Sequence, residues 1–168
     1  DWFNFAANPH PDVMEVIHSN SEHIWNWLIK FEKNLELLKS LKSNPEQALW
    51  SRLSFNINIE AILVLKNHPE HIMWATLSGN SCDLALDLLS ENLNKIDWEN
   101  LAGNINPRAM HLLRANLDTY KLYDSIPLWR SLSMNPTLEA LELLEDNLDK
   151  INWDTLVFNK SPKAMELI

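Results

Sequence analysis

The tryptophans of this chain recur at a nearly constant interval. Seven of the eight stand about 24 residues apart, except for one interval of 31 residues. They are Trp2, Trp25, Trp50, Trp74, Trp98, Trp129 and Trp153. A fixed period of this length is typical of stacked supersecondary units, none of which can bury its apolar face alone. The interval therefore predicts a repeat array rather than a globule.

The pattern inside each repeat is helical when residues are counted from the tryptophan as position 0. Positions +11, +12, +14 and +15 are mostly apolar, as in Leu112 and Leu113, and this spacing indicates an amphipathic helix from about +9 to +18. Position +3 is apolar in every copy and shares a face with the tryptophan, which indicates a shorter helix from 0 to about +5. We expect an all-α fold: an α-solenoid of about seven short-helix/long-helix repeats, forming a single array over residues 1–168.

Asparagine occupies position +6 in six of the seven copies. These are Asn8, Asn56, Asn80, Asn104, Asn135 and Asn159. Because the chain has only two glycines and asparagine tolerates the left-handed conformation, we interpret these residues as the ends of the short helices. The same interpretation applies at +18, to Asn20, Asn92, Asn116 and Asn147.

Capping residues are expected at the start of the helices. Position +8 carries Asn58, Asn106, Thr137 or Ser161, and a proline follows in several copies, including Pro107 and Pro162. Asp97 and Asn152 precede two of the tryptophans and are expected to cap the short helices.

The tryptophans have two interpretations. Each follows an apolar residue at +22 of the preceding repeat, such as Ile72 or Ile96, so we expect the indoles to wedge between neighbouring helix pairs in the core. Exposed tryptophans at even spacing would instead form a stacking platform for single-stranded nucleic acid. The core interpretation is the one that we favour.

Two repeats are irregular. The second, residues 25–49, has Phe31 at +6 and resembles one longer helix. An insertion at residues 120–127 lengthens the interval before Trp129, and we expect it to leave the stack or to bend it. Either irregularity marks a kink or contact site, or is a copy that has drifted. Because neither end carries a polar capping helix, we expect a segment of a longer array, or ends covered by neighbouring chains through end-to-end or lateral self-assembly.

Composition, charge and motifs argue against several classes of function. The formal net charge is −9 and the lysines and arginines are scattered, which argues against binding a nucleic-acid backbone. No long apolar run predicts a membrane span, and one cysteine, Cys82, fits a reducing compartment. His68 and His71 flank a proline without further ligands, so no metal is expected; with no phosphate loop or nucleophile motif, neither a cofactor nor enzymatic activity is expected.

What remains is a surface on the longer helix. Positions +10, +13 and +16 point away from the predicted core and change from acidic to basic and back along the chain, as expected of a surface for a protein partner or of solvent-facing positions that drift freely. The candidate partner-binding residues are Glu15, His18, Leu63, Lys66, Asp87, Arg108, His111, Arg114, Glu142 and Glu145.

The sequence motif of the repeat resembles that of a viral protein family. The segments Ile96-Asp97-Trp98, Ser133-Met134-Asn135-Pro136 and Asn147-Leu148-Asp149-Lys150-Ile151-Asn152-Trp153 are similar to the tandem tryptophan- and asparagine-rich helical repeats of giant nucleocytoplasmic large DNA viruses. The resemblance covers nearly the whole chain, is poorest in the second repeat and brings no catalytic residues. It implies a viral scaffold located in the host cytoplasm or in the virion.

Overall fold

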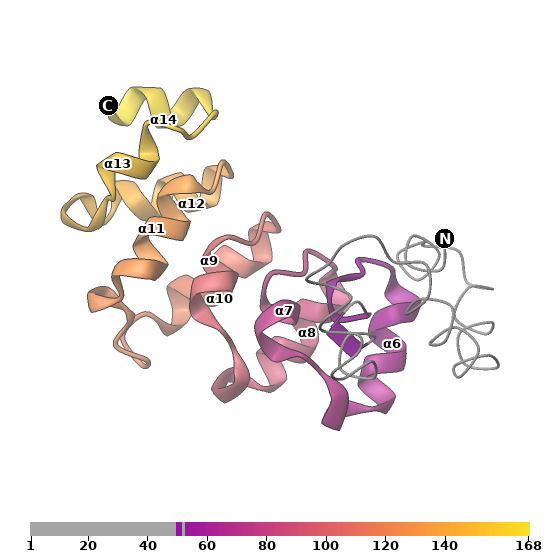
Figure 1. Cartoon of the computed structure of the whole chain (residues 1–168). Helices are drawn as coiled ribbons and strands as arrows, with labels where there is room; N and C mark the ends of the chain where they lie inside the picture. The colour runs from indigo at the N-terminus through magenta and orange to yellow at the C-terminus, as the bar shows by residue number, and fades with distance from the viewer. Residues whose placement is uncertain (1–49, 52) are drawn as a thin grey trace, which may run out of the picture. The chain divides into compact units, whose positions relative to one another are not determined.

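The computed structural model describes residues 50, 51 and 53–168, and Figure 1 shows their helices. The chain divides into two compact units, residues 1–73 and 74–168, and each is described by itself. All regular structure in the described part is helical, which confirms the predicted all-α class. The irregular second repeat at 25–49 lies outside the described residues.

The first unit contributes one repeat to the description. Residues 50, 51 and 53–55 are helical, and α6 (Ile59–Asn67) follows after a short turn. A 3₁₀ turn at Pro69–His71 packs against α6. Trp50 thus lies in a helical segment, and the longer helix begins at position +9, as predicted.

The second unit alternates between the two predicted helix types. Its helices are α7 (Trp74–Ser78), α8 (Asp83–Glu91), α9 (Trp98–Ala102), α10 (Pro107–Asn116), α11 (Ile126–Met134), α12 (Leu138–Glu145), α13 (Trp153–Leu156) and α14 (Pro162–Leu167). Three 3₁₀ turns lie between them, at Leu93–Lys95, Leu122–Asp124 and Leu148–Lys150. Every longer helix of this unit begins at +9, and α7, α9 and α13 begin at their tryptophan. Only α11 starts earlier, three residues before Trp129.

The helices of the second unit pack in two rows. The helices that carry the tryptophans contact one another in the order α7, α9, α11, α13, and the others contact in the order α8, α10, α12, α14. The two helices of one repeat also contact each other in the pairs α7 and α8, α9 and α10, and α11 and α12. Side chains at +3, +11 and +15 fill the space between the rows in the repeats of Trp74, Trp98 and Trp129. In the repeat of Trp98 these are Leu101, Ala109 and Leu113, all fully buried.

The asparagine at +6 is buried and links one repeat to the next. Asn104 is 1% exposed, and its side-chain nitrogen donates to the carbonyls of Ser78 (3.0 Å) and Asn80 (2.9 Å) in the preceding repeat. Its Oδ1 accepts from the backbone N–H of Asn106 (2.9 Å). Asn135 and Asn159 repeat all three bonds one and two repeats later. These bonds form an asparagine ladder along the second unit.

The predicted left-handed conformation of these asparagines is wrong. In the part of the chain that the structure describes, Lys121 alone has a positive φ, of 53°, and neither glycine does. The ladder asparagine ends the short helix through its side chain rather than through its backbone angles. The asparagine at +18 also acts through its side chain: the amide nitrogens of Asn92, Asn116 and Asn147 each donate at 2.8 Å to the carbonyl four residues before them.

Most of the predicted N-caps are confirmed. The side chains of Asp97 and Asn152 accept from the backbone N–H groups three residues later, at 2.9 and 3.1 Å. Asn106 and Thr137 cap α10 and α12. Ser161 precedes α14 without a capping bond from its side chain.

A serine at +4 makes a second link between repeats. The sequence pattern did not predict this link. The hydroxyl of Ser78 donates to the carbonyl of Trp74 (2.8 Å) and accepts from the backbone N–H of Asp97 (3.0 Å). Ser133 does the same two repeats later, with Trp129 and Asn152. The serine hydroxyl thus provides a hydrogen-bond acceptor for the backbone N–H just before the next repeat begins.

The tryptophans are not uniformly buried, so the prediction that all of them form core is wrong. Trp129 is 3% exposed, whereas Trp74 and Trp98 are half-buried and Trp153 is 49% exposed. The difference comes from the insertion. Tyr123 stacks on Trp129 with ring centroids 6.3 Å apart, and its carbonyl accepts from the indole N–H at 3.1 Å.

The insertion at 120–127 folds back onto the repeats. Tyr120 lies against Trp98 with centroids 4.9 Å apart, and Leu122 is buried. The last residues of the insertion add a first turn to α11. The insertion is thus a cover for two tryptophans rather than a connection that leaves the stack.

Replacing Asn104 with alanine should lower the free energy of unfolding by about 3 kcal/mol, because two buried carbonyls and one N–H lose their partner. Urea unfolding followed by circular dichroism measures the change. Asn100→Ala is the matched control: Asn100 is exposed, and its change should stay within about 0.5 kcal/mol. Equal losses in both variants would contradict the ladder.

Replacing Trp129 with alanine should lower the free energy of unfolding by about 3–5 kcal/mol, since it empties a closed core site. Trp153→Ala removes the equivalent side chain from a site that is half open to water, so its loss should be less than half as large. Urea unfolding monitored by circular dichroism compares the two. A larger loss for Trp153 would refute the assignment of Trp129 to the core by the insertion.

Candidate partner-binding surface

The structure places the candidate partner-binding residues in both units. Leu63 and Lys66 lie exposed on α6 in the first unit. Glu15 and His18 lie outside the described residues. The remaining six are Asp87 on α8, Arg108, His111 and Arg114 on α10, and Glu142 and Glu145 on α12.

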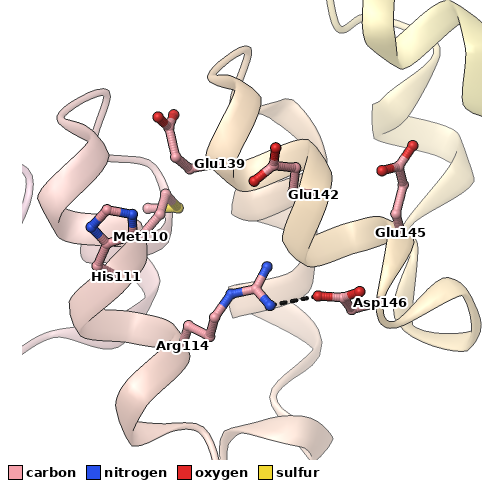
Figure 2. A pocket seen from close by; sticks show the side chains of 7 residues that line it. All are labelled: Met110, His111, Arg114, Glu139, Glu142, Glu145 and Asp146. Atoms are coloured by element: carbon pink, nitrogen blue, oxygen red, sulfur yellow. Dashed lines mark hydrogen bonds and ion pairs between the residues drawn. The ribbon is translucent and has the colours of Figure 1, made fainter.

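The candidate residues on α10 and α12, except Arg108, face a common hollow. They are exposed because +11 and +15 of the same helices point into the core. Since α10 and α12 pack against each other, the two exposed rows come together. The hollow has a volume of about 480 Å³ and is shown in Figure 2. Its lining is Met110, His111, Arg114, Glu139, Glu142, Glu145 and Asp146.

Three of these lining residues were absent from the predicted set. Met110, Glu139 and Asp146 stand at +12, +10 and +17. We call the exposed positions +10, +13 and +16 of the longer helices the strip. Glu139 stands at +10, as Arg108 does, so the repeat alone places it in this strip. Asp146 takes part because Arg114 reaches across the hollow to it, a contact between repeats that helix periodicity does not contain (Figure 2).

Ion pairs connect successive long helices through this strip. Arg108 on α10 contacts Asp87 on α8 at 2.5 Å and Asp83 at 3.6 Å. Arg114 on α10 contacts Asp146, just after α12, at 2.5 Å. Several of the predicted partner-binding charges therefore already have partners within the chain.

The same arrangement links α12 to α14. Lys163 contacts Glu145 at 2.6 Å and Glu166 at 3.8 Å. The hydrogen bond to Glu145 raises the pKa of Lys163, as the bond to Asp87 raises the pKa of Arg108. Both cations are therefore charged at neutral pH.

The middle of the hollow retains groups without ionic partners. His111, Glu139 and Glu142 form no ion pair with any residue that the structure describes. Glu142 extends from α12 toward α10 in Figure 2. The hollow therefore combines an imidazole with two carboxylates that form no direct ion pair with a described residue, and the paired Arg114 and Glu145 flank them.

His68 and His71 lie against Trp50. The ring of His71 stacks on Trp50 with centroids 4.3 Å apart, and Glu70 lies 3.7 Å from His68 and 3.6 Å from His71. Over the described ranges, no group of three His, Cys, Asp or Glu side chains is placed to hold a metal ion. The thiol of Cys82 is free and half-buried.

The comparisons with known proteins add no assignment. No family model, curated protein or solved structure matches the chain. Among the described residues, the structure contains no helix with the length and apolar character needed to cross a bilayer.

The ion pair between Arg114 and Asp146 should couple the two residues by only about 0.2–1 kcal/mol, because both side chains are close to half exposed. A double-mutant cycle with alanine at each position, read by urea unfolding, measures this coupling. The same cycle with Arg114 and Asp154, on α13, serves as control and should be additive. A coupling above about 2 kcal/mol would make the pair structural rather than part of a surface.

Proposed function

We propose that the chain is a non-enzymatic helical-repeat scaffold whose hollow between α10 and α12 binds a protein partner. The proposal extends the repeat over both units as one α-solenoid of about seven copies. It is supported by the two rows of helices and by the asparagine ladder of the second unit. The observation that carries it is that Glu139, Glu142 and His111 meet in one hollow without ionic partners there.

The charges of the hollow favour a protein partner that brings positive charge. The groups without a direct ion pair among the described residues are carboxylates, which repel phosphate and attract lysine or arginine. Glu139 and Glu142 lie three residues apart on one face of α12 and repel each other, so a partner's cation placed between them would gain energy. The paired charges at the rim hold the two helices in place around this centre.

The wider role follows from the family resemblance. We propose a viral structural or host-interaction protein, acting in the host cytoplasm or in the virion. An adaptor would engage a host protein through the hollow, whereas a structural element would engage other copies or particle proteins. The two roles predict different proteins bound to the purified chain.

Binding of single-stranded nucleic acid is the second candidate. The observation in its favour is the exposure of Trp153, with Trp74 and Trp98 partly accessible. Bases would stack on these rings and quench their fluorescence, with a steep dependence on salt. The acidic net charge opposes it.

Affinity capture of the tagged protein from its source, with a nuclease-treated control, identifies the partner. A stoichiometric protein that survives nuclease supports the scaffold. Recovery of only the protein itself and particle proteins supports the structural form of it. Loss of every partner on nuclease treatment would replace the scaffold by the nucleic-acid candidate.

Removing the two free carboxylates should weaken the captured complex. We expect Glu139→Gln/Glu142→Gln to raise Kd at least tenfold, which corresponds to about 1.4 kcal/mol, with no loss of thermal stability. Glu99→Gln/Asp154→Asn is the matched control, because it removes the same charge from the first turns of α9 and α13. Isothermal titration calorimetry at two salt concentrations measures both. If the control weakens binding equally, long-range charge and not the hollow is responsible.

Reversing Arg108 and Arg114 is a less direct test. Arg108→Glu would face Asp87 and Asp83, and Arg114→Glu would face Asp146. Such a variant alters the contacts between repeats together with the surface. Variants of Glu139, Glu142 and His111 avoid this effect.

A further inference from the structure

The insertion borders a second hollow in the second unit. It lengthens α11 by a first turn, so α11 starts at Ile126 while the neighbouring α13 starts at Trp153, its own position 0. The added turn therefore has no counterpart on α13 to pack against. A hollow of about 360 Å³ opens there, within the range of about 300–1,000 Å³ that is usual for ligand sites. We call it the insertion hollow.

One side of the insertion hollow is apolar. Ile126 is 75% exposed although it stands on a helix whose next residues, Leu128 and Trp129, are buried. Tyr123 and Trp129 line the hollow beside it with their rings stacked on each other. The aromatic pair gives the site a rigid wall, while Ile126 offers an aliphatic surface that the fold itself does not cover.

The other side carries an excess of negative charge. Asp124 and Asp149 have side chains that are 98% and 77% exposed. Lys150 lies between them, with its Nζ 4.0 Å from Asp124 and 3.6 Å from Asp149. One lysine is thus shared by two carboxylates. Both carboxylates remain largely exposed and can accept a hydrogen bond from a second cation.

We infer that the insertion hollow binds a short segment of a partner protein in which an aliphatic side chain stands beside a lysine or arginine. The aliphatic group covers Ile126 against the aromatic wall. The basic group completes the charge balance of Asp124 and Asp149. An acidic segment would face two carboxylates, and a purely basic one would leave Ile126 in water. The inference rests on the proposed scaffold function only in taking the partner to be a protein.

A displayed library of random 12-residue peptides tests this inference. After selection on the wild-type protein, enriched peptides should carry an aliphatic residue next to lysine or arginine. Synthetic copies should bind Ile126→Ser at least tenfold more weakly, and Asp124→Asn/Asp149→Asn at least fivefold more weakly, than wild type by fluorescence anisotropy. Because all three side chains are exposed, these variants keep the fold, which their melting temperatures check.

Matched controls separate this site from other surfaces. Ile105→Ser removes another exposed isoleucine, 61% exposed in the turn before α10, and Asp118→Asn/Asp154→Asn removes two other exposed carboxylates. Neither should change peptide affinity.

The selection can overturn the inference without touching the proposed function. Peptides that ignore Ile126→Ser but are lost in Glu139→Gln/Glu142→Gln would support the hollow between α10 and α12 and refute the insertion hollow. Failure to enrich any peptide, enrichment of acidic peptides, or equal losses in the Ile105 control would each refute it as well.

Discussion

The second unit depends on a buried side-chain amide that belongs to two repeats at once. At position +6, the nitrogen of each ladder asparagine satisfies two carbonyls of the preceding repeat, while its oxygen receives the N–H that starts its own longer helix. A carboxamide suits this position because it has two donor hydrogens and an acceptor on one rigid plane. Leucine would leave the carbonyls unpaired, and aspartate would lack the donors. Short helices of four or five residues can therefore end inside the protein without stranding backbone groups.

The charged side chains of the strip fall into two groups. Arg108, Arg114 and Lys163 each contact an acid on or next to a neighbouring long helix, so they act within the array. Exposed pairs contribute little to stability, but they set which side chains remain available. Glu139 and Glu142 form no direct ion pair within the described residues, and we therefore propose the hollow between α10 and α12 as the part of the strip best suited to a partner.

The insertion shows how a repeat array acquires individual sites. Its two tyrosines cover Trp98 and Trp129, and its last residues lengthen α11. Burial of Trp129 and exposure of Ile126 are consequences of the same seven extra residues or so. The regular repeats supply the stacked helix pairs. The insertion interrupts this regularity and borders a hollow whose lining differs from that of the hollow between α10 and α12.

The sequence by itself determined the helices. Periodic apolar positions, prolines and capping side chains act within one repeat, so the starts at positions 0 and +9, the core at +3, +11 and +15, and the exposed strip follow from the printed residues. The tertiary structure decided what depends on which side chains meet across a turn or between repeats. Asn104 ends its helix by bonding to Ser78 and Asn80, which intrinsic backbone preference does not contain. Trp129 is core and Trp153 is not because only one has Tyr123 stacked on it. Arg114 is paired because Asp146 lies across the hollow, whereas Glu142 has no such partner. Hydrogen bonds, ring contacts and ion pairs between repeats require coordinates, since a repeat period gives the spacing of residues along the chain but not which side chains meet across it.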